Sequence, residues 1–224
     1  MKIVTFSGID GAGKSTQIRA FSTWLDATGQ RCELLTFWDN VVTFPRLREF
    51  MSHKAFGGDQ GIGSPAKPLA RRDKNVTAWP VTAVRFCLYL ADAMNTRRIV
   101  NQVRGRGADV VIFDRYIYDE LANLPLRRWW ARAFVRLALW IVPQPHAAYV
   151  IDAAPAAAYA RKPEYPLEFL RSNRAAYLAL AALTGHMTVI EPRSPEEMGL
   201  EIREAFLRIP LPQKTEIARV PALQ

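Results

Sequence analysis

Short apolar runs alternate along the chain with longer segments in which apolar residues recur every three to four positions. The run at 2–7 is followed by glycines and then by the segment 13–28. In that segment Ile18, Phe21 and Leu25 have helical spacing, which predicts a strand, a loop and an amphipathic helix in that order. The same reasoning predicts strands at 31–38, 109–113, 147–151 and 187–190, and helices at 44–53, 79–104, 156–162, 167–183 and 195–207.

Short strands that alternate with longer helices are typical of βαβ units. The sequence therefore predicts an α/β protein with a mostly parallel sheet that is flanked by helices on both faces. The stretch 56–68 is rich in glycine and proline and is expected to be a loop. We expect a single domain at 1–208 and a proline-containing tail at 209–224 that lies on the surface.

The composition is that of a protein with one sizeable core, since the chain has 224 residues and 50% of them are apolar. Its longest apolar stretch, 133–143, is interrupted by Arg136 and is too short to span a bilayer. The N-terminus passes directly into the first predicted strand without a secretory segment, which favours a cytoplasmic protein. Cys32 and Cys87 match no metal-binding or redox spacing, so each is expected to be a buried thiol.

The formal net charge of +9 suits an acidic ligand such as nucleic acid, a phosphorylated metabolite or an anionic membrane. The arginines are scattered in pairs over several predicted elements and do not run together. This pattern favours a phosphate site or a solvated surface over a nucleic-acid stripe, and no helix-turn-helix, zinc or RNA-binding motif accompanies it. We therefore expect no specific nucleic-acid partner.

The segment GIDGAGKS at 8–15 has the spacing of a phosphate-binding loop, and it lies between a predicted strand and a predicted helix. Its glycines let the backbone fold around a phosphate with N–H groups pointing inward, and the helix N-terminus adds partial positive charge. Lys14 is expected to contact the terminal phosphates of a nucleoside triphosphate, and Ser15 to bind Mg²⁺ through its hydroxyl. The residues expected to hold the nucleotide are Gly8, Asp10, Gly11, Ala12, Gly13, Lys14, Ser15 and Thr16.

An aspartate and an arginine follow an apolar run in the segment VVIFDRY. At the end of a parallel strand, Asp114 would lie at the carboxyl edge of the sheet and face the phosphate loop across the crevice. Asp114 can then hold a magnesium-bound water, and Arg115 can bind an anionic acceptor through two parallel hydrogen bonds. Asp114 is thus a candidate both for catalysis and, with Ser15, for metal binding.

Three segments, FSGIDGAGKSTQ, VVIFDRY and RKPEYPLEFLRSNRAAYLAL, together resemble the thymidylate kinase family from Ile3 to about Leu207. The resemblance implies a P-loop kinase fold, ATP with Mg²⁺ as donor, transfer of the γ-phosphoryl group to a deoxynucleoside monophosphate such as dTMP, and frequently a homodimer. It also implies that Asp10 contacts the sugar hydroxyl of the acceptor. Asp114 and Arg115 match the family's pair beside the acceptor phosphate.

The segment ARKPEYPLE joins two predicted helices and suits a short hinged lid at about 160–167. Closure of such a lid excludes water, and a kinase needs this to avoid hydrolysing its donor. Ala12 in the phosphate loop supplies no charge, so a further cation has to come from elsewhere. The resemblance places Arg161, with Lys162 beside it, over the transferring phosphates; the alternative is a solvated helix end.

The long predicted helix contains CLYLADAMN, which matches the family segment that recognises thymine. Tyr89 takes the position of the aromatic residue that stacks on the base, but Ala93 stands where the family has an arginine that bonds to it. The turn that holds the acceptor phosphate in the family is also absent, and Arg46 or Arg48 is the candidate to replace its arginine.

The residues after the Asp-Arg-Tyr motif depart from the family as well, because Asp119 and Glu120 stand where a serine and a small polar residue are usual. Two carboxylates suit a donor-rich partner better than the O4 carbonyl of thymine. The acceptor-binding candidates are Asp10, Tyr89, Arg115, Tyr116 and Glu120.

These departures leave three functions open: a nucleoside monophosphate kinase, a nucleotide-binding protein without transfer activity, and a nucleoside kinase with Asp10 or Glu120 as base. The stretch RRWWARAFVRLALW predicts a helix that buries its aromatic side in the core or in a dimer contact. The alternative is that the region 127–142 lies on a membrane surface.

Overall fold

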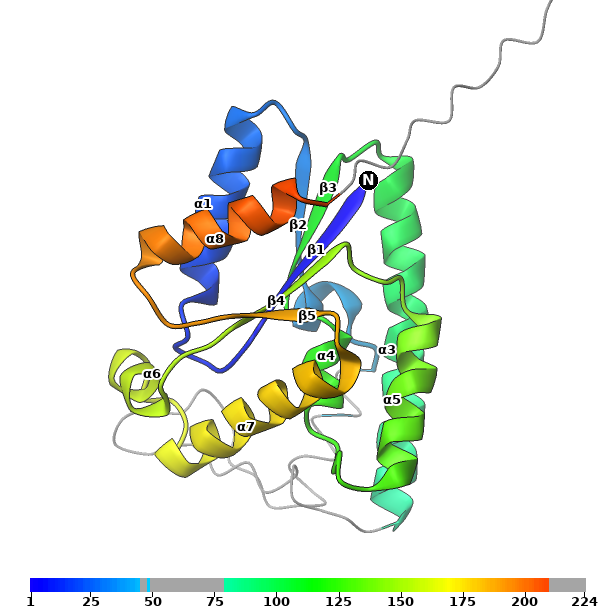
Figure 1. Ribbon diagram of the computed structural model, residues 1–224. Coiled ribbons are helices and arrows are strands. Elements are labelled where there is room, and N and C mark those ends of the chain that lie inside the picture. Colours follow the sequence, from blue (N-terminus) through cyan, green and yellow to red (C-terminus); the bar gives the residue numbers. More distant parts are fainter. Residues whose placement is uncertain (45–47, 49–78, 210–224) are drawn as a thin grey trace, which may run out of the picture.

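The computed structural model describes residues 1–44, 48 and 79–209, and its centre is a five-stranded parallel sheet (Figure 1). The strand order is β2-β3-β1-β4-β5, and each neighbouring pair is parallel. The predicted α/β architecture is therefore confirmed. The strands are β1 (Lys2–Ser7), β2 (Cys32–Thr36), β3 (Val110–Asp114), β4 (Ala147–Ile151) and β5 (Met187–Ile190).

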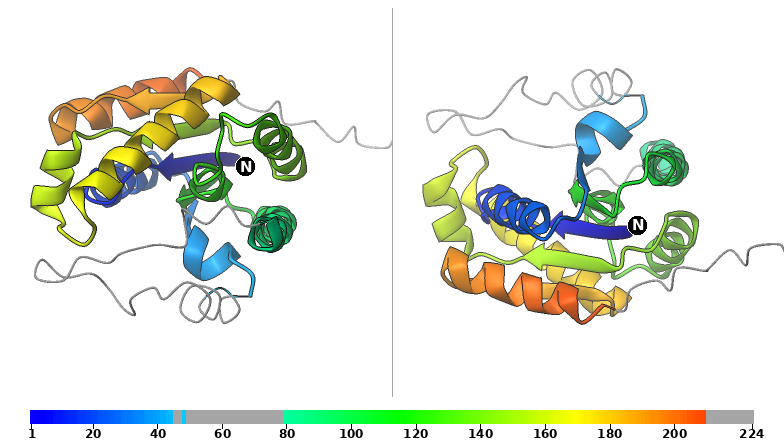
Figure 2. Two further views of the ribbon diagram at one scale, coloured as in Figure 1. Left: turned by 90° about the horizontal axis from the view of Figure 1, so that it is seen from below. Right: turned by 90° about the horizontal axis from the view of Figure 1, so that it is seen from above.

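Helices cover both faces of the sheet. On one face α1 and α8 contact each other and the strands, whereas α7 packs on the other face and continues through α4 to the adjacent pair α3 and α5 (Figures 1 and 2). The helices are α1 (Lys14–Ala27), α3 (Trp79–Gly105), α4 (Ile117–Leu121), α5 (Trp129–Ile141), α6 (Pro155–Arg161), α7 (Leu167–Thr184) and α8 (Pro195–Leu207), with one π-helical turn, η1 (Phe37–Val41).

The core lies between these layers. Every residue of β1 is buried, because helices cover both sides of the sheet and a polar face is not needed. The face of α1 that carries Ile18, Phe21 and Leu25 is buried as the spacing predicted. The carboxyl ends of the strands meet the loop before α1, which places functional residues from several strands at one edge.

Two elements on this edge differ from the sequence prediction. The second strand ends at Thr36 because the chain turns into η1, where Asn40 Oδ1 accepts a hydrogen bond from the Thr36 amide (2.7 Å). The short helix α4 follows directly after the Asp114-Arg115 pair and has too few residues to show a helical period. The predicted helix at 44–53, loop at 56–68 and tail at 209–224 lie, apart from Phe44, Arg48 and Ile209, outside the described residues.

The expectation that both cysteines are buried thiols is wrong. Cys87 is exposed on α3, where the next two residues face inward instead, and Cys32 is half-buried with its sulfur 3.2 Å from Ser22 Oγ. Helices in the described part of the chain are either too short or too polar to cross a membrane.

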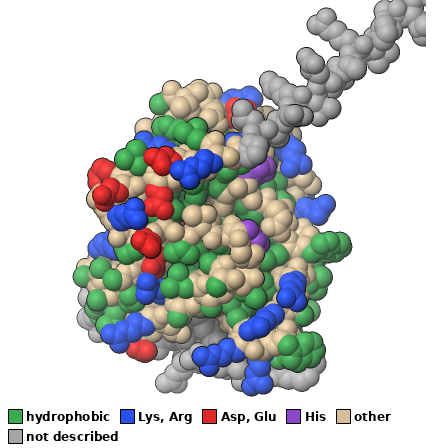
Figure 3. Space-filling view, in the orientation of Figure 1, with side chains coloured by type: hydrophobic (Ala, Val, Ile, Leu, Met, Phe, Trp, Pro, Cys, Tyr) green, Lys and Arg blue, Asp and Glu red, His purple; other side chains and the backbone are tan. Residues whose placement is uncertain are grey.

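The tryptophan-rich helix α5 divides its aromatic residues between core and surface. Phe134 is buried and stacks on Phe86 of α3 with ring centroids 3.9 Å apart. Trp129 and Trp140, about three turns apart on one face, are both 80% exposed. Figure 3 shows hydrophobic and basic side chains along the flank that α5 forms, whereas acidic side chains gather on the opposite side of the same view. The expectation of aromatic burial in the core thus holds for Phe134 and is wrong for Trp129 and Trp140.

Candidate active site

The loop between β1 and α1 leaves the N-terminus of α1 open. Gly13 precedes the helix in the left-handed conformation (φ 98°), and no side chain caps the helix. The backbone amides of Gly13, Lys14 and Ser15 donate to no backbone carbonyl in the described residues. An uncapped helix N-terminus with such amides favours an anion.

Two glycines of the loop are required by close packing behind it. A Cβ at Gly8 would lie 2.5 Å from the carbonyl oxygen of Ile151, at the end of β4. A Cβ at Gly11 would lie 2.4 Å from the carbonyl oxygen of Ala158, in α6. Both distances are shorter than any real Cβ contact, so only glycine lets the loop rest on these elements.

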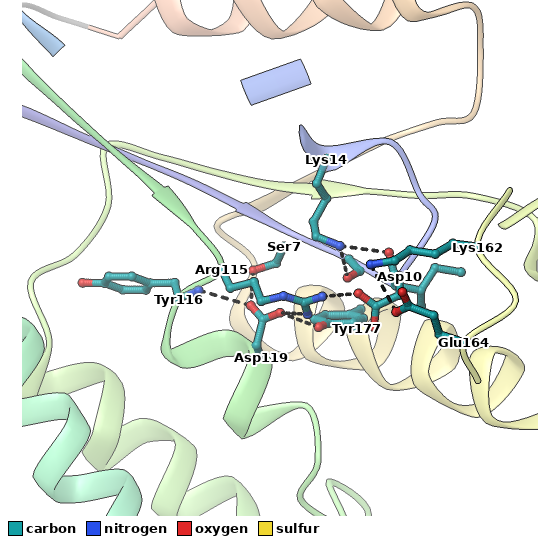
Figure 4. A network of polar contacts seen from close by, with 11 residues as sticks. Ser7, Asp10, Lys14, Arg115, Tyr116, Asp119, Lys162, Glu164 and Tyr177 are labelled. Carbon is teal, nitrogen blue, oxygen red and sulfur yellow. Dashed lines mark hydrogen bonds and ion pairs between the residues drawn. The ribbon is translucent and has the colours of Figure 1, made fainter. Parts of the chain in front are cut away.

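Lys14 lies across the loop and is nearly buried. Its Nζ donates hydrogen bonds to the carbonyl oxygens of Gly8 and Ile9, each 2.9 Å long (Figure 4). Burial, and after it the charge of Arg115, lowers the pKa of Lys14 to about 8, and Asp10 opposes this. The ammonium group is thus held beside the open amides, where a phosphate would compensate its desolvation.

Asp114 ends β3 at the same edge and carries an unusual oxygen. Its Oδ1 is buried and accepts no hydrogen bond within the described residues. Burial raises the pKa of Asp114, whereas Lys14 and Arg115 lower it. Mg²⁺ prefers carboxylate and hydroxyl oxygens, so this oxygen and the exposed hydroxyl group of Ser15 at the start of α1 fit a magnesium ion.

Arg115 adopts a backbone conformation that is uncommon for a side-chain-bearing residue (φ 69°), and its amide donates to the Phe6 carbonyl oxygen (2.9 Å). This conformation turns the guanidinium toward the phosphate loop. Nη2 pairs with Asp10 of the loop, and Nη1 donates to Asp119 Oδ1 of α4 at 2.9 Å (Figure 4). Arg115 therefore connects the loop to α4.

Asp119 is fully occupied by donors from the protein. Besides Arg115, it accepts hydrogen bonds from Ser7 Oγ (2.7 Å), the Tyr177 hydroxyl (2.6 Å) and the Tyr116 amide (3.2 Å). The expectation that Asp119 faces a donor-rich ligand is therefore wrong, because its partners are all internal. Ser7 and Tyr177 are functional neighbours that the sequence analysis missed.

Tyr116 is placed away from this group. Its ring is buried, and its hydroxyl donates to the carbonyl oxygen of Pro143 (2.7 Å), so only its backbone contributes to the site (Figure 4). This placement does not match the acceptor contact expected from the sequence, because the side chain fills the core instead.

The lid segment lies between α6 and α7, next to the loop. A Cβ at Gly13 would lie 3.9 Å from Arg161 Nη1, which places this exposed arginine at the mouth of the loop. Lys162 pairs with Glu164 at 3.1 Å. Arg161 thus lies beside the phosphate loop, and its role and that of Lys162 over the transferring phosphates stay predictions.

An ion pair fixes the far side of the lid. Arg174 of α7 makes two hydrogen bonds to Asp152, just after β4, with lengths of 2.7 and 2.6 Å. This pair is not among the residues predicted from the sequence, although Asp152 follows an apolar strand in the same way as Asp114 does.

No protein-family model matches the chain. Over 217 residues it is 29% identical to a "Probable thymidylate kinase" of Pyrobaculum aerophilum, covering 93% of this chain and 98% of that protein. It is 30% identical over 215 residues to a thymidylate kinase of Leifsonia xyli subsp. xyli, covering 89% of this chain and 91% of that one. The chain belongs to the thymidylate kinase family.

A solved thymidylate kinase has the same fold. The crystal structure of the enzyme from Ehrlichia chaffeensis superposes with a TM-score of 0.58 at 17% identity, and the match covers 92% of this chain and 98% of that one. The P-loop kinase fold expected from the motifs is thus confirmed.

This thymidylate kinase family member has its own arrangement on α3. Tyr89 and Ala93 are both buried there, one helical turn apart. Burial raises the pKa of Tyr89, and the charge of Glu120 adds to the effect. Tyr89 and Glu120 thus lie close to each other, and their contact with the acceptor stays a prediction.

Arg48 lies beside these residues. It donates to Glu120 Oε1 (2.7 Å) and to the Thr43 carbonyl oxygen (3.0 Å), and it pairs with Asp92. Arg48 is thus bound to carboxyl groups of α3 and α4, whereas Arg46 is outside the described residues.

Proposed function

We propose that this chain transfers the γ-phosphoryl group of ATP to thymidylate, forming dTDP and ADP. The observation that carries the proposal is the convergence of Lys14, Asp114 and Arg115 at the open N-terminus of α1. Membership of the thymidylate kinase family supports ATP as the donor and a nucleoside monophosphate as the acceptor.

The donor end is assigned to the phosphate loop. We propose that the amides of Gly13, Lys14 and Ser15 and the Lys14 ammonium bind the phosphates of ATP. Ser15 and Asp114 would hold Mg²⁺. When bound, this ion would neutralise negative charge on the phosphates of ATP. Gly8 and Gly11 act indirectly, since they let the loop rest on β4 and α6.

The acceptor end is assigned to Arg115 and Asp10. Arg115 is held by Asp10 and Asp119 before any substrate binds, so little reorganisation is needed for it to receive the acceptor phosphate. In the reaction an oxygen of that phosphate forms a bond to the γ-phosphorus, and the bond from the γ-phosphorus to the β–γ bridging oxygen breaks. We propose that Asp10 contacts the acceptor sugar and that Arg161 meets the transferring group on closure of the lid, 160–167.

The nucleoside kinase alternative is less well supported. A base toward a sugar hydroxyl needs an available carboxylate, but Asp10 is paired with Arg115. Glu120 is also unsuited, because burial raises its pKa well above the usual value and favours the protonated form. A nucleotide-binding protein without transfer would not need Arg115 held ready beside the phosphate loop.

We further propose that the exposed face of α5 is covered by a second copy of this chain. The face presents Trp129, Leu137 and Trp140, and Met94 of the adjacent α3 is exposed as well. Tryptophan, methionine and arginine are enriched at protein interfaces, whereas lysine and acidic residues are depleted, and 127–142 contains neither. A dimer is therefore favoured over the membrane-surface alternative, and we place the protein in the cytoplasm.

The test is formation of ADP from ATP and Mg²⁺ with a panel of nucleosides and nucleoside monophosphates. We expect turnover that depends on dTMP and a fall of about 10²- to 10³-fold in kcat for Lys14→Ala. Lys2→Ala is the matched control, because Lys2 is also nearly buried and its Nζ donates to a backbone carbonyl, that of Ile209 (3.1 Å). Equal turnover by Lys14→Ala and the wild type would contradict the assignment of the loop.

A further inference from the structure

The Arg115 guanidinium is bound by two carboxylates that lie in different surroundings. Nη1 donates to Asp119 of α4 (2.9 Å), and Nη2 pairs with Asp10 of the phosphate loop (Figure 4). The side chain of Asp119 is only 1% exposed, whereas that of Asp10 is 20% exposed. A ligand can therefore reach one of the two pairs more easily than the other.

Both oxygens of Asp119 carry two donors. Oδ1 accepts from Arg115 and from the Tyr177 hydroxyl (2.6 Å), and Oδ2 accepts from Ser7 Oγ (2.7 Å) and from the Tyr116 amide (3.2 Å). These donors come from β1, from α7 and from the segment before α4, so the carboxylate is fixed from three directions. Moving it would leave several buried donors unpaired, which is costly.

The backbone of Arg115 is fixed as well. Its amide donates to the Phe6 carbonyl oxygen of the central strand (2.9 Å), and its φ of 69° is one that few side-chain-bearing residues adopt. The protein thus sets the place of the guanidinium through the backbone and through Nη1. Nη2 is the end of the side chain whose partner can change.

The charges around the phosphate loop also favour a change of partner at Nη2. Lys14 and Arg115 are the two cations of this group, and Asp10, Asp114 and Asp119 are its three carboxyl groups. An acceptor phosphate adds negative charge, and like charges repel strongly where water is largely excluded. Withdrawal of one carboxylate from the guanidinium relieves this repulsion. Asp10, at the surface, can withdraw at a lower cost than the buried Asp119.

We propose that Asp119 is the positioning residue of the acceptor arginine: it keeps Nη1 of Arg115 in place throughout, while Asp10 releases Nη2 to an oxygen of the acceptor phosphate. The inference rests on the proposed function, which assigns the acceptor phosphate to Arg115. It divides the two carboxylates into one that is fixed and one that is exchanged. The released carboxylate can then accept a hydrogen bond from the sugar hydroxyl that the proposed function assigns to Asp10.

The test compares the binding of dTMP and thymidine, which differ only in the phosphate, by calorimetry with Mg²⁺ and a non-hydrolysable ATP analogue present. The ratio of their association constants measures what the phosphate contributes, and a variant that only loosens the fold weakens both ligands alike. Asp119→Asn keeps the shape of the side chain but removes its charge, so this ratio should fall about 10- to 100-fold. Asp10→Asn removes the carboxylate that is displaced, so its ratio should be retained or rise.

Asp109→Asn is the matched control. Asp109 also accepts from a backbone amide and a guanidinium, both of Arg31 (3.0 and 3.5 Å), but it is half exposed and lies before β3, at the end of the strand away from Asp114. Its ratio should equal that of the wild type. Ser7→Ala decides the matter if Asp119→Asn fails to fold, because it takes one donor from Oδ2 and leaves the carboxylate. Its ratio should fall by a smaller factor, and an unchanged ratio overturns the inference.

Three further results would overturn the inference. An Asp119→Asn ratio equal to that of the wild type would mean that Asp119 has only a structural role. Equal falls in Asp119→Asn and Asp10→Asn would mean that both carboxylates are fixed. Equal binding of dTMP and thymidine by the wild type would mean that Arg115 does not receive the phosphate.

ADP formation from ATP and dTMP, measured on the same proteins, separates the two proposals. The expected ratios without ADP formation would contradict the proposed function and support this inference. ADP formation with a ratio that is the same in all variants would overturn the inference alone.

Discussion

The carbonyl oxygen of Ala158 lies so close to Gly11 that a Cβ on the glycine would stand 2.4 Å from it. This contact fixes α6 against the back of the phosphate loop. Arg161 follows at the end of the same short helix and reaches the mouth of the loop near Gly13. The shape of the loop and the position of the proposed lid cation thus depend on one backbone contact.

We predict that Gly11→Ala impairs folding and nucleotide binding together. The positive φ of Gly11 (80°) alone should cost about 1 to 3 kcal/mol in an alanine, and the clash with Ala158 adds to this. Gly29→Ala is the matched control, since Gly29 has a similar φ (74°) but no neighbouring atom within 4 Å. Urea unfolding and ATP-analogue titration of both variants test this, and equal losses in the two would exclude the contact as the cause.

We predict that Tyr177→Phe raises the KM for the acceptor more than it changes kcat. The Tyr177 hydroxyl donates to Asp119, which in turn holds Arg115, so its loss loosens the guanidinium before substrate binds. The lost bond to a charged group should also lower the free energy of unfolding by about 1.5 to 3 kcal/mol.

The control for this prediction is Tyr149→Phe. Tyr149 is equally buried, but its hydroxyl donates to the Ile202 carbonyl oxygen on the other face of the sheet (3.0 Å). Steady-state kinetics with varied acceptor should show an unchanged KM in this variant. A similar rise of KM in both tyrosine variants would mean that general destabilisation is responsible.

We predict that replacing both Trp129 and Trp140 by serine converts the proposed dimer to a monomer. The fold of the monomer itself should not be destabilised, because both side chains are exposed on its surface. Light scattering after size-exclusion chromatography measures the mass. Leu207→Ser serves as control, since Leu207 is exposed on α8, on the opposite face of the sheet. A wild type that is monomeric but sediments with anionic vesicles would favour the membrane alternative.

We predict that Glu120→Gln makes the stability less dependent on pH. The folded-state pKa of Glu120 is raised, so the folded chain keeps a proton that the unfolded chain loses as the pH rises above about 4.5. The free energy of unfolding of the wild type should therefore fall relative to that of the variant, by up to about 1.4 kcal/mol per pH unit until the folded-state pKa is reached. Urea unfolding at several pH values checks this, and parallel pH curves for the two proteins would contradict it.

The parts of the site that depend on local spacing could be predicted from the sequence. The glycines, Lys14 and Ser15 are close in the chain, and Asp114 follows a short β-branched apolar run of the kind that is typical of a buried strand. For Gly8 and Gly11 the sequence indicated only a loop that folds around phosphate, and the structure adds packing against β4 and α6 as a reason for the glycines.

Neither the charge nor the hydrogen-bond partners of Asp119 and Glu120 could be predicted from local spacing. Asp119 is occupied by Ser7, which is 112 positions away, and by Tyr177, which is 58 positions away. Glu120 is paired with Arg48, 72 positions earlier. Whether a carboxyl group is charged, and whether it faces a ligand or the protein, depends on such distant partners, which periodicity and motif spacing do not report.

Both ends of the proposed lid are tethered: Gly11 and Ala158 hold α6, and the two hydrogen bonds between Arg174 and Asp152 hold α7. Only the turn at 162–166 lies between these two anchors without being part of a helix. The anchors therefore confine any closing movement of the proposed lid to this turn, which carries Lys162 and Glu164.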